Sequence, residues 1–358
     1  MITNSTLVLS KNNQILEPIT LTEANITIII PVHKGGDSFR KCLSSLVQFV
    51  PVCTEIIVVV DGDDEDSWNI AQEFGTKVLM LSSNAGPARA RNVGAHAATG
   101  DILFFIDADV LIAPKAIHKL LQAFNNEPNL AAVIGSYDDE PGASNFLSQY
   151  KNLFHHYTHQ TASEEAFTFW GACGAMRREV FLSLGGFDES YRRPCIEDIE
   201  LGYRLRRAGY QIRLCKDVQV KHLKRWGVVS LLRAEVFYRA IPWTQLIWRD
   251  RQLNNDLNLG VESRLSVILV FSLLSALIGA SWWRGYLAIA SIISLLLLII
   301  NAPVYSFFLK KCGFWFTIRV LPWHWFYYLY GGLAFALGTV QYLFLKWFSL
   351  KPKAPIQY

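Results

Sequence analysis

The sequence lacks paired cysteines, a strong charge of one sign and a recognisable leader. Its six cysteines include no Cys-x-x-Cys pair and no regular spacing, which excludes a zinc ribbon and a disulfide framework and favours a reducing, cytosolic setting. The net charge of +4 gives no case for a nucleic-acid partner. Residues 1–25 contain no basic start followed by an apolar run, so we expect an N-terminal arm there instead of a secretory signal peptide.

What the chain has in abundance is apolar side chains. Hydrophobic residues make up 51% of the 358, and the mean hydropathy is +0.22, which is too apolar for an ordinary soluble protein. Residues 265–283 and 285–309 carry no charge, and each run exceeds the roughly 18 apolar residues needed to span a bilayer. A third candidate runs from about Trp323 to Leu345. We therefore expect an integral membrane protein with about three transmembrane helices within residues 261–350.

The charges that flank these runs predict an orientation. Lys310 and Lys311 after the second run, and the arginine-rich stretch before the first, suit the cytoplasmic side. We therefore expect the part of the chain before the first run on that side of a membrane such as a bacterial inner membrane. Three spans would place the lysines of the tail, residues 351–358, on the other side. Either the charge rule is broken here, or Phe314–Tyr330 is a re-entrant or interfacial piece.

The first 225 residues alternate between strand and helix patterns. Such alternation implies parallel pairing through right-handed crossovers, which predicts an α/β fold with a mostly parallel sheet flanked by helices. In sheets of this kind ligands bind at the carboxyl ends of the strands. Strands are expected at Ile26–Pro31, Glu55–Val60, Lys77–Leu81, Ile102–Ile106, Leu130–Gly135, Gln211–Leu214 and Val218–Lys221, and helices at Ser38–Phe49, from Pro87 to about Ala98 and at Glu197–Ala208.

Polar residues follow the ends of the first three strands and suit a nucleotide diphosphate. An ionised Asp61 could accept hydrogen bonds from a base imide or a ribose hydroxyl. Arg89 and Arg91 could bring guanidinium groups to a phosphate or a base. Taken alone, Asp61 could equally belong to an ordinary turn, and both arginines could be solvated helix charges. The residues expected to line this crevice are Pro31, Val32, Asp61, Asn84 and Arg89.

The fourth strand ends in Asp107-Ala108-Asp109. In an extended chain successive side chains alternate faces, so both carboxylates would point to one side and the small Ala108 would leave room for a bulky ligand. Two carboxylates at a strand end make a hard oxygen site suited to Mg²⁺ or Mn²⁺. The alternative is a polar turn that closes a core strand.

A second acidic pair, Glu197 and Asp198, begins the helix expected from Glu197 to Ala208. Consecutive helical residues point about 100° apart, so the two carboxylates cannot do the same job. The alternative is that both merely favour the helix dipole as residues of the first turn.

The strand ends and acidic pairs fall within a series of motifs: IIIPVHKGG, IIVVVDGDDED, NAGPARARNVGAHAATGD, FFIDADV, FWGACGAMRR, GGFDE and the Glu197-Asp198 pair. In order and spacing this series resembles the family 2 glycosyltransferases, with their GT-A nucleotide-diphospho-sugar-binding fold, over about residues 25–225. By that resemblance Pro31, Asp61 and Arg89 hold the nucleotide. One departure is that Val60 precedes Asp61 where the family usually has two consecutive aspartates before glycine, so Asp61 is expected to contact the base alone.

The resemblance also implies a mechanism with a nucleotide-diphosphate sugar as donor and Mn²⁺ or Mg²⁺ as cofactor. Asp107 lies on the nucleotide and metal side, and Asp109 is the metal ligand. Asp198 is the general base that takes the acceptor proton in an inverting transfer without a covalent intermediate. Glu197 is expected either to orient the acceptor hydroxyl or to stabilise the loop of residues 191–195. His222 is either a further metal ligand, as in some relatives, or a hydrogen-bonded histidine at a strand end.

The run HLKRW at residues 222–226 echoes the Gln-x-x-Arg-Trp signature of processive polysaccharide synthases. The glutamine is missing, since His222 takes its place, and fewer residues separate the run from Asp198 than in those enzymes. Transfer of a single sugar is therefore favoured over polymerisation. A non-catalytic membrane scaffold of this fold is another alternative, but it would need the loss of a metal or base residue. A nucleotidyltransferase would not be expected to carry the Glu-Asp helix start.

Residues 226–260 join the catalytic part, residues 26–225, to the first apolar run and are rich in tryptophan and arginine. Helices of this composition lie in the membrane interface, although packing on the catalytic domain is an alternative for one face. Because this stretch directly follows His222, we expect an acceptor that is lipid-linked or an envelope glycan delivered at the membrane.

Overall fold

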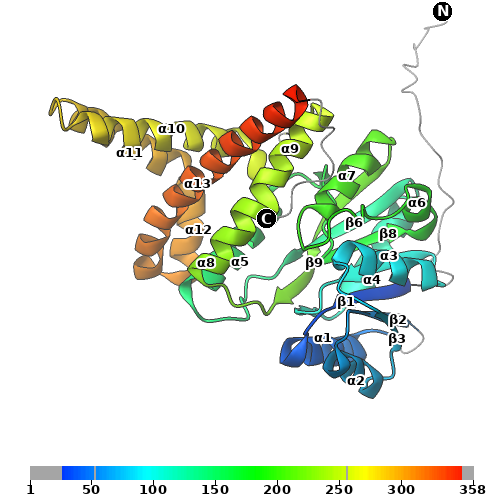
Figure 1. Ribbon diagram of the computed structural model, residues 1–358. Helices are drawn as coiled ribbons and strands as arrows, with labels where there is room; N and C mark the ends of the chain where they lie inside the picture. The colour runs from blue at the N-terminus through cyan, green and yellow to red at the C-terminus, as the bar shows by residue number, and fades with distance from the viewer. Residues whose placement is uncertain (1–25, 52–53, 255–256, 349–358) are drawn as a thin grey trace, which may run out of the picture.

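The computed structural model describes residues 26–51, 54–254 and 257–348. The expected N-terminal arm and the tail at residues 351–358 lie outside the described residues. Figure 1 shows a sheet with helices on its two faces, and a second, wholly helical region beside it. The helices α10 and α11 form a hairpin that extends away from the sheet, while α13 runs alongside α9.

Within the described residues the strands form one sheet of nine, and helices occur throughout. The strands are β1 (Ile26–Val32), β2 (Glu55–Asp61), β3 (Lys77–Leu81), β4 (Ile102–Ile106), β5 (Val110–Ile112), β6 (Leu130–Tyr137), β7 (Glu165–Ala166), β8 (Cys173–Arg177) and β9 (Gln211–His222). The helices of the sheet domain are α1 (Gly36–Phe49), α2 (Glu65–Glu73), α3 (Pro87–Ala97), α4 (Ala116–Asn126), α5 (Phe146–Thr161), α6 (Arg178–Ser183) and α7 (Glu197–Arg207). The later helices are α8 (Val228–Arg233), the π-helix η1 (Ala234–Ala240), α9 (Ile241–Asp250), the short 3₁₀ helix η2 (Leu257–Leu259), α10 (Val261–Gly279), α11 (Tyr286–Ile300), α12 (Ala302–Cys312) and α13 (Phe314–Trp347).

The strand order is β3-β2-β1-β4-β8-β6-β9-β5, and β7 pairs with β9. Strands β1 to β4 are parallel neighbours, which brings their carboxyl ends to one edge as the sequence predicts. β8 lies between β4 and β6 and is antiparallel to both. The expected α/β fold with helices on a mostly parallel sheet is confirmed.

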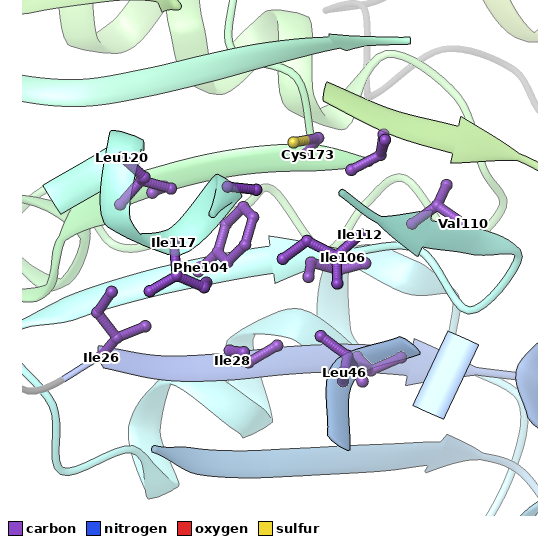
Figure 2. Packing of buried hydrophobic residues seen from close by; sticks show 14 of the residues in the cluster. Ile26, Ile28, Leu46, Phe104, Ile106, Val110, Ile112, Ile117, Leu120 and Cys173 are labelled. Carbon is purple, nitrogen blue, oxygen red and sulfur yellow. The ribbon is translucent and has the colours of Figure 1, made fainter. Parts of the chain in front are cut away.

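Alternating side chains of the central strands supply two separate cores. In β4, Phe104 and Ile106 pack with α1 and α4 on one face, while Leu103 and Phe105 pack with α3, α6 and α7 on the other. Figure 2 shows the first of these clusters, with Phe104 and Ile106 above Ile28 of β1. Each fully buried side chain of this size stabilises the fold by about 1.5–3 kcal/mol, so the two faces together fix the strand ends that carry the polar residues.

One expected pair of strands proved to be a single strand. Residues 211–214 and 218–221 both belong to β9, which pairs in parallel with β6 along most of its length. The register of this pairing shifts between Ile134 and Ser136 of β6. The polar residues between the two apolar runs of β9 lie opposite this irregularity. The continuous strand carries His222 to the same edge as the ends of β1 to β4.

The apolar helical region departs from the three straight helices expected. α10 and α13 are the two described helices long and apolar enough to cross a membrane, and the number rises to three if α11 and α12 form one bent span. The expected second span is broken, because the axes of α11 and α12 differ by 64°. Pro303 lacks the N–H that would bond the carbonyl of Ile299. At this bend Asn301 donates to Ser266 Oγ at 3.0 Å and accepts from the Tyr328 hydroxyl at 2.7 Å, which ties α10 and α13 to the break.

Phe314–Tyr330 is not a re-entrant loop but the first half of the continuous helix α13, which spans about 51 Å at 1.5 Å per residue. This half packs on the catalytic domain, because Val320 of α13 and Phe308 of α12 share a buried cluster with Tyr150 and Leu153 of α5. Whether it also lies in the membrane interface stays a prediction.

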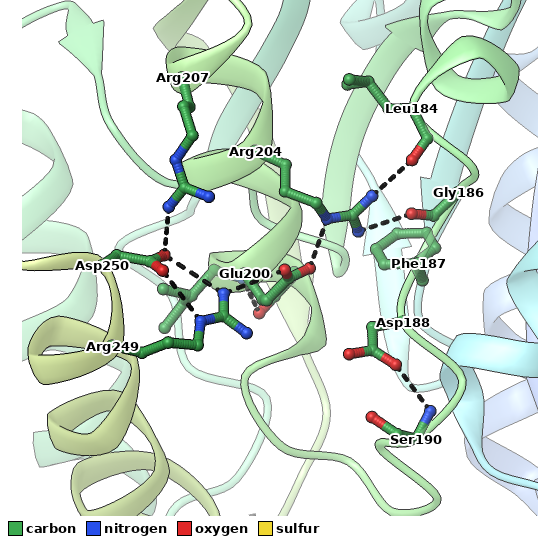
Figure 3. A network of polar contacts seen from close by, with 12 residues as sticks. Leu184, Gly186, Phe187, Asp188, Ser190, Glu200, Arg204, Arg207, Arg249 and Asp250 are labelled. Carbon is green, nitrogen blue, oxygen red and sulfur yellow. Dashed lines mark hydrogen bonds and ion pairs between the residues drawn. The ribbon is translucent and has the colours of Figure 1, made fainter. Parts of the chain in front are cut away.

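The segment after β9 packs on the catalytic domain along one face. Trp243 and Leu246 of α9 are buried with Tyr203 of α7, and Trp243 Nε1 donates to the Tyr203 hydroxyl at 3.0 Å. Figure 3 shows the charged part of this contact, in which Glu200 of α7 accepts from Arg249 of α9 at 3.3 Å. The expected alternative of a packed helix is therefore confirmed for this face, and α7 is held directly against α9.

Candidate active site

The carboxylate of Asp61 organises the nucleotide end of the expected crevice. Its two oxygens accept hydrogen bonds from the backbone N–H groups of Ala85 and Gly86, at 2.7 and 2.9 Å. His33 Nδ1 lies 2.8 Å from the carbonyl oxygen of Asp61. The loops that follow β1, β2 and β3 are therefore joined through one residue. Because each carboxylate oxygen has a second lone pair, Asp61 can still accept from a ligand.

Gly86 has a structural reason to be glycine. Its φ is +93°, and a Cβ there would lie 2.4 Å from the carbonyl oxygen of Arg192. The loop before α3 thus presses directly against the loop before α7. The expected donor and acceptor sides of the site would therefore be in contact at this point.

The remaining residues predicted for nucleotide binding lie in different environments. Val32 is buried in the core beneath the crevice, and Pro31 is half-buried opposite Val59 of β2. Asn84 and Arg89 are exposed on the loop and first turn of α3. The structure does not bring Arg89 to the buried carboxylates, and its role in holding the nucleotide stays a prediction.

Asp107, Ala108 and Asp109 do not continue the strand as expected. β4 ends at Ile106, and the N–H of Val110 bonds the carbonyl of Asp107 at 3.3 Å, so the segment is a turn that leads into β5. The expectation that strand alternation aligns both carboxylates is therefore wrong. Asp107 Oδ1 accepts from Arg91 at 2.7 Å, whereas Asp109 Oδ2 lies 3.4 Å from His222 Nε2. The turn gives the two carboxylates different partners.

Arg91 joins the two acidic pairs. Its Nη2 donates to Asp107 at 2.7 Å and its Nη1 donates to Glu197 at 2.9 Å, while only 5% of its side chain is exposed. A Cβ at Gly171 would lie 3.0 Å from the Arg91 guanidinium carbon, so the loop before β8 closes over it. The expected contact of Arg91 with phosphate or base is not what the structure shows, because both terminal nitrogens are engaged by carboxylates.

The sequence contains a signal for the buried position of Arg91 that is not part of any of the motifs. Ala88, Arg91 and Ala95 recur at helical spacing and are all buried on one face of α3. Gly94 lies on that side too, since a Cβ there would meet Ile29 of β1 at 2.5 Å. An arginine within a stripe of small residues must face the sheet, whereas Arg89 lies off that stripe.

Glu197 and Asp198 have different partners, as the helical spacing predicts. Glu197 Oε1 is bound by Arg91, and its Oε2 accepts from the N–H of Cys195 at 2.9 Å. The loop before α7 is thus stabilised by Glu197, which was one of its two expected roles. Asp198 Oδ2 accepts from the N–H of Gly171 at 3.0 Å and makes no ion pair within the described residues.

The two carboxylates outside the Arg91 bridge have opposite pKa shifts. Burial and the negative charge of Glu197 raise the pKa of Asp198 to about 6, against smaller lowering effects that include the Gly171 hydrogen bond. Burial also acts to raise the pKa of Asp109, but His222 beside it, with a contribution from Lys224, holds that pKa below its usual value. Asp198 is therefore suited to take up a proton near neutral pH, and Asp109 is suited to stay ionised.

His222 is held rigidly beside Asp109. Its Nδ1 lies 3.3 Å from Asn152 Oδ1, and its ring stacks on Tyr137 with centroids 4.7 Å apart. The N–H of Leu223 also bonds the carbonyl of Asp109 at 2.8 Å. Neither Asn152 nor Tyr137 is marked by any motif, because each comes from an element far from His222 in sequence. The partner at Nδ1 leaves Nε2 directed at Asp109.

Asp109 and His222 could hold a divalent cation together with oxygens from a substrate. Within residues 26–51, 54–254 and 257–348, no group of three or more His, Cys, Asp or Glu side chains is arranged to bind a metal. A carboxylate with an imidazole still fits Mg²⁺ or Mn²⁺, since such ions commonly take one or two protein ligands and complete their shell with phosphate oxygens and water. The geometry therefore suits a cation that arrives with a diphosphate.

Part of the chain matches a known protein family and several named relatives. Residues 27–185 match the family described as "Glycosyl transferase family 2". The uncharacterized glycosyltransferase YibD of Escherichia coli is 35% identical over 100 residues, which cover 27% of this chain and only 29% of that protein. The O-antigen chain rhamnosyltransferase WbaN of Salmonella anatum is 24% identical over 238 residues, covering 62% of this chain and 74% of that protein.

A solved structure extends the similarity of fold beyond the sheet domain. The mannosyltransferase PcManGT of Pyrobaculum calidifontis, solved with GDP-Man and Mn²⁺, superposes with a TM-score of 0.55 at 15% identity and covers 94% of this chain and 92% of that one. Identity this low compares the fold alone, and the coverage includes most of the C-terminal helices. Residues 27–185 therefore form a glycosyltransferase domain of family 2 with a GT-A-like fold.

Proposed function

We propose that the chain transfers one sugar from a nucleotide-diphosphate sugar to an acceptor hydroxyl, with inversion at the anomeric carbon. The observation that carries this proposal is that two of the four carboxylates are bound by Arg91 and two are not. Asp107 and Glu197 share Arg91, while Asp109 beside His222 and Asp198 on α7 are left for chemistry. Inversion needs one base and no nucleophilic residue, which agrees with the single carboxylate of raised pKa on the acceptor side.

On this proposal Asp198 takes the proton of the acceptor hydroxyl as that oxygen attacks the anomeric carbon. The N–H of Gly171 holds one Asp198 oxygen in place, and Glu197 keeps the neighbouring loop ordered through Cys195. A divalent cation held by Asp109 and His222 would neutralise the charge that develops on the leaving diphosphate. Asp61 orders the loop at Ala85 against which the nucleotide is expected to rest.

We further propose that the chain is an integral membrane protein with its catalytic domain on the cytoplasmic side. Support comes from the apolar helices α10 and α13 and from the lysines that end α12. The acceptor is then a lipid-linked or envelope glycan, since α9 links the helix that carries Asp198 to α13. Transfer of labelled sugar into an organic-extractable lipid fraction of membrane extract would support this acceptor, and label found only in soluble glycan would contradict it.

The donor proposal is tested by thermal unfolding of the purified full chain in detergent with Mn²⁺ and a panel of UDP, GDP and dTDP sugars. A ligand at 100 times its Kd adds about 2.7 kcal/mol to the stability of the folded state, so the right donor should raise the Tm clearly. Asp109→Asn should lose this shift, whereas Asp217→Asn, a change at an exposed carboxylate of β9, should keep it. The proposal fails if no nucleotide sugar shifts the Tm, or if Asp109→Asn responds like the unchanged protein.

A further inference from the structure

A cluster of three charged side chains lies between the catalytic domain and α13. Lys151 of α5 and Arg239 of η1 both approach the same oxygen of Glu235, at 2.7 and 3.4 Å. Lys151 and Glu235 are 13% and 8% exposed, so that ion pair is closed, whereas 38% of the Arg239 side chain is exposed. Two cations thus share one carboxylate, and the open member of the cluster is Arg239.

Arg239 has no strong partner of its own. Among the described residues, Glu235 is the only carboxylate within ion-pair distance of it, and Lys151 holds that carboxylate more closely. The cluster carries one positive charge in excess, and that excess resides on Arg239, whose side chain is open to a further anion. An anion at the open side of Arg239 would complete it.

The backbone that presents Arg239 is unusual. Residues 234–240 form a π-helix of seven residues between α8 and α9. Pro242 explains its position, because it lacks the N–H that would bond the carbonyl of Tyr238 in an uninterrupted helix. π-helical turns are rare and occur frequently at functional sites.

The charge of Arg239 is also coupled to groups on the reacting side of the domain. Burial lowers its pKa, but the charges of Glu235 and then Asp198 raise it above the usual value, with Tyr137 and Tyr327 as further contributors. Tyr137 is the residue that stacks on His222, and Tyr327 belongs to α13. The candidate base Asp198 and Tyr327 of α13, the helix expected to enter the membrane, are therefore both among the groups whose charge acts on the Arg239 guanidinium.

We propose that Arg239 binds the phosphate of a lipid-linked acceptor, so that the headgroup is held at the membrane side of the site while the acceptor hydroxyl reaches Asp198. This inference rests on the proposed function and names the chemical class of its acceptor. A planar guanidinium with free N–H donors matches phosphate oxygens by forming paired, charge-assisted hydrogen bonds. The apolar tail would leave along α13, which contacts η1 and α9.

The test measures binding of farnesyl phosphate, farnesol and inorganic phosphate to the full chain in detergent. We expect farnesyl phosphate to bind at least tenfold more tightly than either of the other two probes. Arg239→Gln should weaken farnesyl phosphate at least tenfold, and Arg239→Lys should weaken it less. Arg233→Gln, at an exposed arginine of the adjacent helix α8, is the matched control and should bind as the unchanged chain does.

The inference is overturned if Arg239→Gln binds farnesyl phosphate normally or if farnesol binds equally well. Inorganic phosphate with the same Arg239-dependent affinity would also overturn it, because the site would then not select a lipid. The Tm shift with nucleotide sugar and Mn²⁺ is recorded for every variant. Arg239→Gln should keep that shift, which shows that it is folded, whereas a missing shift in the unchanged chain counts against the proposed function alone.

Discussion

Asp107 and Asp109 end a buried parallel strand, whereas Glu197 and Asp198 begin a helix on the other side of Arg91. In each pair one carboxylate is bound by Arg91 and the other is not. The unbound members differ, since the pKa of Asp109 is lowered by His222 and that of Asp198 is raised by burial and by Glu197. Similar acidic pairs can thus be given opposite proton affinities by their neighbours, one suited to bind a cation and one to accept a proton.

The largest expected effect comes from the donor-side carboxylate. Asp109→Asn removes the ionised oxygen proposed to hold the cation, so sugar transfer should be abolished and the affinity for nucleotide sugar should fall. Transfer assays and nucleotide-sugar binding with Mn²⁺ check this, with Asp217→Asn as the control. Full activity in EDTA would contradict the prediction.

The acceptor-side carboxylate should act on the rate and not on donor binding. Asp198→Asn should lower kcat on the order of 10²–10⁴-fold, which is typical for a lost general base, while the Kd for nucleotide sugar stays nearly unchanged. Steady-state kinetics and donor binding on the same preparation separate the two effects. If donor affinity falls instead, Asp198 takes part in donor binding, which contradicts the proposed roles of the two acidic pairs.

The shared arginine should matter for stability. Arg91→Met leaves both of its partners, the buried Glu197 and Asp107, without a cation. Removing one partner of a buried ion pair lowers the free energy of unfolding by about 3–5 kcal/mol. Arg89→Met, two residues earlier on the exposed side of α3, should change stability by about 0.5 kcal/mol or less. Thermal unfolding in detergent compares the two variants. Equal Tm values would contradict the prediction that the Arg91 bridge stabilises the fold.

The smallest expected effect is a shift in the pH profile. Because the pKa of Asp198 is raised to about 6 and its ionised form is the proposed base, kcat should fall about tenfold per unit as the pH drops below about 6. Glu197→Gln removes the negative charge that helps to raise this pKa, so the falling limb should move to lower pH. If kcat falls over the same pH range in Glu197→Gln as in the unchanged chain, a group other than Asp198 is responsible for the pH dependence.

The strands β1 to β4 could be predicted almost residue by residue, because each is a mostly apolar run, and Ile102–Ile106 of β4 is apolar throughout and buried. β8 could not, since Cys173–Arg177 contains glycine and small residues and gains its strand form by pairing with β4 and β6. The break between α11 and α12 was also missed, because the hydropathy of residues 285–309 is uniform while Pro303 acts on a single hydrogen bond.

Local periodicity and composition were enough to predict β1 to β4, the acidic residues at the ends of the strands and helices, and the apolar segments after Arg264. That Arg91 and not Arg89 joins the two acidic pairs follows from how α3 packs in the folded domain. The tertiary fold also brings Asp109 to His222 across the sheet edge, and it places Arg239 beside Glu235 on η1, the element that contacts α13. These facts depend on distances between groups remote in sequence, and such distances, not residue identity, set pKa values and partners.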